Sequence, residues 1–169
     1  MISLQQLLGR EDKFYQLFED SVGQCCQSAA ALSDLVHHPG KPAPLDAFTQ
    51  SRHRHKAIHN EINEALCSDV VTGLEREDII ALTHALYRIP KTIEKIGERL
   101  VMVPSFIEGF DLASQAAMVE RAANTLKSMV LALRKKPDLQ QTKELNNELQ
   151  KIEGDADNLT VQLVTRLYL

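Results

Sequence analysis

Apolar residues recur every three or four positions along almost the whole chain, and this spacing most constrains the fold. The first such run lies between Phe14 and Val36, and the last lies between Leu145 and Leu167. The spacing places these side chains on one face of an α-helix. No stretch of useful length alternates apolar and polar residues as a half-buried strand would. The sequence therefore predicts an all-α protein, an elongated bundle of long antiparallel helices with short connections.

Breaks in this spacing divide the chain into five predicted helices. The first helix ends at "HHPGKPAP", because three prolines and a glycine in eight residues cannot all be helical. The segments "VVTGLERED", "VPSFIEGFD" and "RKKPD" mark the later breaks. The helices that follow the first one are predicted over Leu45–Ser68 and around the apolar stripes 79–103, 112–133 and 145–167.

The apolar stripes also indicate an internal repeat. A shift of 97 residues places the stripe from Val22 to Val36 on the stripe from Val119 to Leu133. A shift of 101 residues places Ile58, Ile62 and Leu66 on Leu159, Leu163 and Leu167. We therefore expect a single domain over 1–169, with a first repeat over about 1–103. The second repeat, about 104–169, is incomplete because its third helix is missing.

Composition excludes several classes of protein. The 169 residues carry a net charge of −4 and no Trp, which argues against nucleic-acid binding. The three cysteines, Cys25, Cys26 and Cys67, form no disulfide framework or zinc motif, and Cys25 lies on an apolar stripe, which predicts a buried thiol. The start lacks the pattern of a signal peptide, and no apolar stretch is long enough to span a bilayer. We expect a cytoplasmic protein that contacts a membrane only through a partner.

Three segments resemble the PhoU-like phosphate-transport regulators, most closely the branch associated with low-affinity Pit phosphate permeases. They are "KFYQLFEDSVGQCCQSAAAL", "EINEALCSDVVTGLEREDIIALTHAL" and "LQKIEGDADNLTVQLVTRLYL". The resemblance implies two three-helix repeats, the second without its last helix. It also implies a regulatory or accessory role in phosphate transport, in which the chain binds a phosphate permease or a related regulatory protein.

The resemblance further implies metal clusters, of iron or zinc, on carboxylate pairs with the spacing E-x-x-x-D. Residues four apart share one helix face, and two carboxylates there suit a hard cation. In the first repeat the corresponding positions are Arg52 and Lys56, with Lys91 from the third helix, so we expect no carboxylate cluster there. The second repeat keeps the pair as Glu153 and Asp157, which makes it the candidate metal site.

The three cations of the first repeat have two interpretations. Arg52, Lys56 and Lys91 are candidates for an anion site, with phosphate as the ligand that the resemblance suggests. Alternatively, the cations form a solvated face or pair with Glu94 and Glu98 inside the bundle.

Two histidines of the second predicted helix are a second candidate site. His55 and His59 are four residues apart and could ligate zinc or nickel from one helix face. Alternatively, they line a polar face and pair with acids of neighbouring helices.

Catalytic motifs give no support for an enzyme. G-x-S-x-G, a Walker loop and H-E-x-x-H are all absent from the sequence. We therefore expect a binding protein, and the apolar surface left by the missing helix predicts a homo-oligomer contact. Two other classes remain open: a metal-dependent enzyme on a helical bundle, and a helical adaptor unrelated to phosphate.

Overall fold

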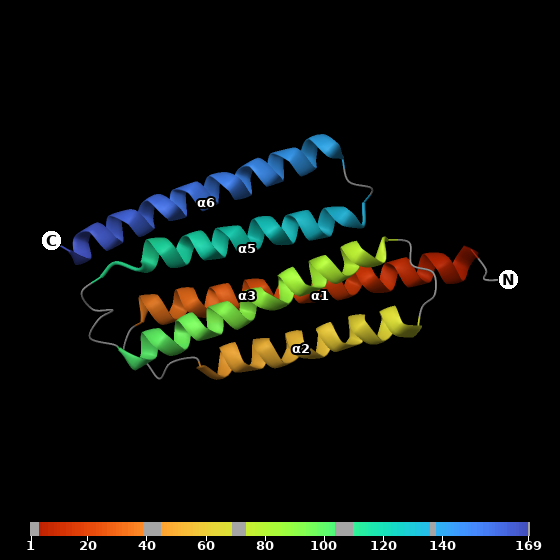
Figure 1. Cartoon of the computed structure of the whole chain (residues 1–169), viewed down its shortest axis with the longest axis horizontal. Helices are drawn as coiled ribbons and strands as arrows, with labels where there is room; N and C mark the ends of the chain where they lie inside the picture. The colour runs from red at the N-terminus through yellow and green to blue at the C-terminus, as the bar shows by residue number, and fades with distance from the viewer. Residues whose placement is uncertain (1–3, 39–44, 69–73, 104–109, 136–137, 169) are drawn as a thin grey trace.

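The chain folds entirely into helices over the residues that its computed structural model describes, which are 4–38, 45–68, 74–103, 110–135 and 138–168. These ranges contain five helices and no strand, so the predicted all-α bundle is confirmed. The helices run along the long axis of the molecule (Figure 1). They are α1 (Leu4–His37), α2 (Leu45–Ser68), α3 (Arg76–Met102), α5 (Ala113–Leu133) and α6 (Leu139–Leu167).

The helix ends follow local sequence signals. The bounds of α2 are the predicted ones, and α3 begins just after Glu75 with Glu77 and Asp78 in its first turn. Acidic groups at that place complement the positive end of the helix dipole. Helix α6 begins earlier than its first predicted apolar residue, because the Asp138 side chain caps it. The backbone N–H of Gln140 donates to Asp138 Oδ1 at 3.0 Å.

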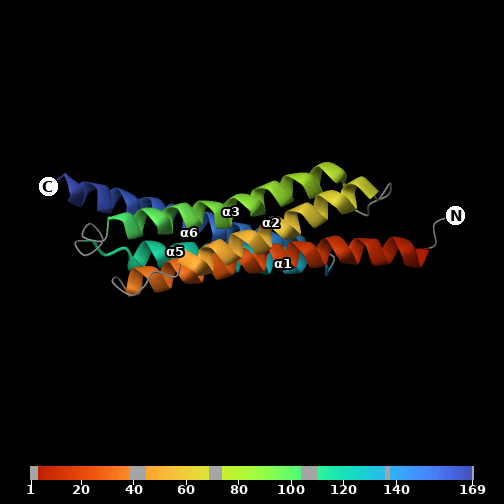
Figure 2. The same cartoon turned by 90° about the horizontal axis from the view of Figure 1, so that it is seen from below.

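Helix α1 is the element shared by the two halves of the bundle. It packs against α2, α3 and α5, and α2 also packs against α3, whereas α6 packs chiefly against α5. Figure 1 shows α6 at one edge of the molecule and α2 at the other. Seen after a quarter turn, α1 and α3 lie on opposite sides (Figure 2). The bundle is therefore a three-helix unit, α1 to α3, with the α5–α6 pair attached through α1.

The core has two parts. Large side chains fill one end of the bundle, and at the other end α2 and α3 approach each other closely. Phe14, Phe18 and Val22 of α1 are buried at one end with apolar residues of α2 and α3. At the other end the buried Phe48 ring lies against Gly97, where an added Cβ would be 2.8 Å from the ring. Gly97 is thus the residue that lets α3 approach α2 so closely. The predicted buried thiol is confirmed, since Cys25 is fully buried.

The inner face of α5 differs from the predicted one. The large residues of the predicted stripe between Leu112 and Leu133 are half-buried, and two of them, Val119 and Leu126, pack against the core from its margin. The small side chains Ala116 and Ala123 are buried instead, with Thr125 and Val130. Small residues allow α5 to lie close to α1, and Cys26 Sγ is 3.4 Å from Ala123 O at that contact. The larger apolar side chains consequently lie beside this contact, on the flank of α5.

None of the helices within the described ranges is both long and apolar enough to cross a membrane.

Candidate functional site

Arg52, the first candidate of the anion site, is engaged inside the bundle. Its Nε lies 2.6 Å from Glu94 Oε2, and the Glu94 residue is only 8% exposed. The hydroxyl of Thr49 donates to Glu94 Oε1 at 3.5 Å. The hydrogen bond with Glu94 and the charge of that carboxylate raise the pKa of Arg52. The sequence alternative of an ion pair with Glu94 is therefore confirmed.

The other two cations lie at the surface. Lys56 of α2 and Lys91 of α3 are exposed, and neither makes an ion pair within the described part of the chain. An anion site at this place would depend on these two lysines, because Glu94 neutralises Arg52. Phosphate binding here stays a prediction.

His55 is buried and faces α1. Its Nε2 shares a hydrogen bond with the Ser21 hydroxyl, while Nδ1 has no hydrogen-bond partner among the described residues. Burial, and to a smaller extent His59, lower the pKa of His55 to about 4. The side chain is therefore neutral at neutral pH and is 2% exposed, so an ion from solvent has no direct access to it.

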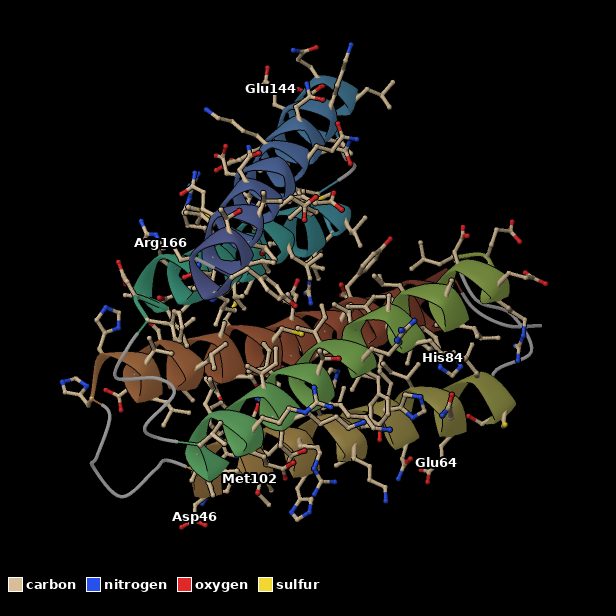
Figure 3. All side chains as sticks on the ribbon, turned by 60° about the vertical axis from the view of Figure 1, so that its left-hand side comes forward. Asp46, Glu64, His84, Met102, Glu144 and Arg166 are labelled. Carbon is tan, nitrogen blue, oxygen red and sulfur yellow. The ribbon has the colours of Figure 1, made fainter. Side chains whose placement is uncertain are left out.

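His59 lies one turn further along α2 in a group of rings between α2 and α3. Its ring centroid is 4.7 Å from that of Tyr87 and 5.6 Å from that of His84. Asn63 Nδ2 lies 3.1 Å from His59 Nδ1. Figure 3 shows His84 on the side of α3 that faces α2. Burial and the nearby His84 lower the pKa of His59. The predicted pairing of His55 and His59 with acids is wrong, because their contacts are aromatic rings, the Ser21 hydroxyl and the Asn63 amide.

The candidate carboxylate pair lies on the surface of α6. Glu153 and Asp157 are both exposed, and the described residues contain no group of three or more His, Cys, Asp or Glu side chains arranged to hold a metal ion. Two carboxylates satisfy only part of an ion's coordination. Iron or zinc at the second repeat therefore stays a prediction.

Sequence reasoning missed a buried hydroxyl contact between α1 and α2. Ser28 and Ser51 share a hydrogen bond of 2.9 Å, and the Ser51 hydroxyl also lies 3.0 Å from Gln24 O. The signal was present, because Ser51 follows Phe48 by three residues and precedes His55 by four. The next residue, Arg52, instead pairs with Glu94 of α3.

A long apolar groove lies between α3 and α5. It consists of three open hollows of about 320, 480 and 190 Å³ that follow one another along α3. The first is lined chiefly by α5 and α6 with Leu82 of α3, the second chiefly by α3, and the third by α1, α3 and α5. Sequence reasoning predicted apolar surface on the last two helices but did not predict that α3 would form one wall. We call this surface the α3–α5 groove, and its lining includes Leu82, Ile89, Ile96, Val119, Leu126 and Leu133.

Neither any protein-family model nor any curated protein matches the chain. The fold and these surfaces therefore define, by themselves, an all-α bundle with internally paired polar groups and an open apolar groove.

Proposed function

We propose that this chain is a regulatory or accessory protein of phosphate transport, which binds a transporter or a signalling protein and catalyses no reaction. The observation that carries the proposal is the α3–α5 groove. Contiguous apolar surface of this kind on a water-exposed bundle is typical of a site that another protein covers. The groove is also formed by regular helices, which offer a rigid surface for docking.

The polar groups of the first repeat support binding over catalysis. Arg52 is engaged by Glu94, and His55 is neutral and hydrogen-bonded to Ser21. These groups stabilise the contacts of α2 with α1 and α3, and none of the four residues lines the groove. We infer that the first half serves as a scaffold.

The phosphate part of the proposal depends on the resemblance of three segments to PhoU-like regulators. These segments occupy α1, the junction of α2 and α3, and the second part of α6. A phosphate permease, or a regulatory protein associated with one, is therefore the partner that we propose.

The test is native capture of the tagged full chain from its own cells. Ile96 lines the groove and is 38% exposed, while Ile80 is 43% exposed on another face of the same helix. Ile96→Glu and Ile80→Glu are thus a matched pair. We expect the unchanged chain and Ile80→Glu to recover a phosphate permease, and Ile96→Glu to lose it.

Two outcomes would overturn the proposal. Recovery of defined partners that have no connection with phosphate would favour the helical adaptor. A stoichiometric metal in the purified chain, together with a hydrolytic or redox activity that depends on it, would favour the metal-dependent enzyme.

A further inference from the structure

We infer that the α3–α5 groove binds an amphipathic helix of a partner protein, with acidic residues along one flank and basic residues along the other. The inference deepens the proposed function, on which it rests for the existence of a partner, by stating the chemistry of the segment that docks.

The first argument is the shape of the groove. Along α3 it extends from Leu82 to Leu100, which at 1.5 Å per residue is about 27 Å, or five helical turns. Its lining is mainly apolar, and the polar residues that line it are Arg88, Thr92, Gln115 and Thr142. An apolar groove of this length matches the stripe that a helix presents at every third or fourth residue.

The second argument is the internal symmetry of the bundle. Residues 26 and 123, which the 97-residue shift matches, contact each other where α1 meets α5, as residues near a two-fold axis do. The α5–α6 pair therefore corresponds to α1–α2. In the first half, α3 packs against both members of its pair. At the corresponding place beside α5 and α6, the described part of the chain has no helix, so the first half itself indicates that a helix fits there.

The third argument is the charge on the α3 edge of the groove. Arg88 lines the groove, and Lys95 and Arg99 follow it by seven and eleven residues, which places all three on one helix face. All three are exposed. None of them makes an ion pair within the described ranges. This edge is positively charged and requires acidic groups on the occupant.

The opposite edge, on α6, has Lys143 one turn after Leu139 and is acidic in its second half. Leu139 and Thr142 line the groove at the start of α6. Glu153 follows Thr142 by eleven residues, or three turns, and Asp157 follows Leu139 by eighteen residues, or five turns. Both carboxylates therefore lie on the groove side of α6, exposed and without an ion pair among the described residues. An occupant must be basic where it lies beside this acidic half of α6 and acidic along the other flank.

The experiment uses the full chain and three fluorescent helical peptides of about twenty residues that share one leucine stripe. One peptide is acidic on one flank and basic on the other, the second is acidic on both flanks, and the third is basic on both. We expect the mixed peptide to bind tightest by roughly fivefold, the effect of a few exposed ion pairs. Ile96→Glu should weaken its binding at least roughly tenfold by placing a charge in the apolar contact, and Ile80→Glu should leave it unchanged.

Reversal of the acidic edge provides a test that does not depend on the apolar contact. In the double variant Glu153→Lys and Asp157→Lys both edges are basic, so the peptide that is acidic on both flanks should become the tightest binder. Both sites are exposed, and circular dichroism checks that the variant is folded. Absence of binding, equal affinities for the three peptides, or an unchanged order in the variant would overturn the inference.

These results are distinguishable from a failure of the proposed function. If the peptides fail but the chain still recovers a phosphate permease, docking uses another face. If the peptides bind as expected but no permease is recovered, the groove is a helix site with a different biological partner.

Discussion

At the residue scale, the buried carboxylate of Glu94 depends on one cation. Glu94 is the buried acid of the described residues, and Arg52 with Thr49 supplies its polar contacts. Removal of one member of a buried pair leaves the other charge without compensation, whereas removal of both leaves no charge to compensate.

We therefore predict that Arg52→Met lowers the free energy of unfolding by about 2 kcal/mol, less than for a fully buried pair because the Arg52 side chain is one-third exposed. The double variant Arg52→Met with Glu94→Met should recover most of this loss. Urea unfolding at pH 7 measures both, with Arg54→Met on the exposed face as the control. A loss equal to that of the control would show that the ion pair contributes nothing to stability.

The buried side chain of His55, three residues after Arg52 in α2, predicts a loss of stability in acid. The pKa of His55 is about 4 in the folded chain and close to its ordinary value of 6.5 when unfolded. The unfolded state therefore binds the proton first as the pH falls. Stability contributed by the neutral ring is complete above about pH 6.5 and is lost between 6.5 and 4, with a slope that approaches about 1.4 kcal/mol per pH unit.

His55→Gln should reduce this slope, because glutamine can bond to Ser21 but does not titrate. Chemical unfolding between pH 4.5 and 7.5 measures the difference, and the exposed His53→Gln should leave the slope as it is. Part of the slope should persist in His55→Gln, since the pKa of His59 is also lowered. Identical slopes in all three proteins would contradict the assignment of a neutral, buried His55.

At the element scale, two helical glycines predict opposite effects of the same substitution. A Cβ on Gly97 would lie 2.8 Å from the buried Phe48 ring, whereas a Cβ on Gly154 meets nothing within 4 Å. Alanine gains about 0.5–1 kcal/mol over glycine in a helix interior. Gly154→Ala should therefore stabilise by this amount, and Gly97→Ala should destabilise by about 1–3 kcal/mol through overpacking.

Thermal unfolding followed by circular dichroism measures both changes. Phe48→Leu in the background of Gly97→Ala should restore part of the loss if the ring is the obstacle. An increase of the unfolding temperature in Gly97→Ala would show that α3 does not need the close approach to α2.

The helices could be predicted from the sequence because the apolar period and the Pro and Gly breaks are local signals. Which side of α5 is buried could not be predicted in this way, because the rule that the largest apolar residues are buried does not hold for this helix. Ala116 and Ala123 are buried because close approach to α1 favours small side chains, and that preference depends on a helix about a hundred residues away. The sequence left the Arg52–Glu94 pair as one of two alternatives for the same reason. The two residues lie on different helices, and their contact depends on how those helices pack.

At the scale of the whole molecule, α6 is the least supported helix. It packs chiefly against α5, and Ile152 is its buried residue within the described range. Regions with few buried apolar contacts open at a lower free energy than the core. We predict that amides of α6 exchange with solvent faster than those of α1 and α3.

Hydrogen exchange read by mass spectrometry checks this prediction. The mixed-charge peptide should slow exchange in α6 and α3, the two edges of the groove, and leave α2 unaffected. Protection of α6 equal to that of α1 in the free chain would show that contacts outside the described residues hold this helix.

The shared position of α1 also bears on how the chain is made. Synthesis proceeds from the amino end, and early segments leave the ribosome before later ones exist. Of the other helices in the described ranges, α2, α3 and α5 pack against α1, which emerges before any of them. Each of them can therefore pack against α1 as soon as it leaves the ribosome. Although α1 and α5 are far apart in sequence, α5 does not have to wait for its packing partner to be synthesised.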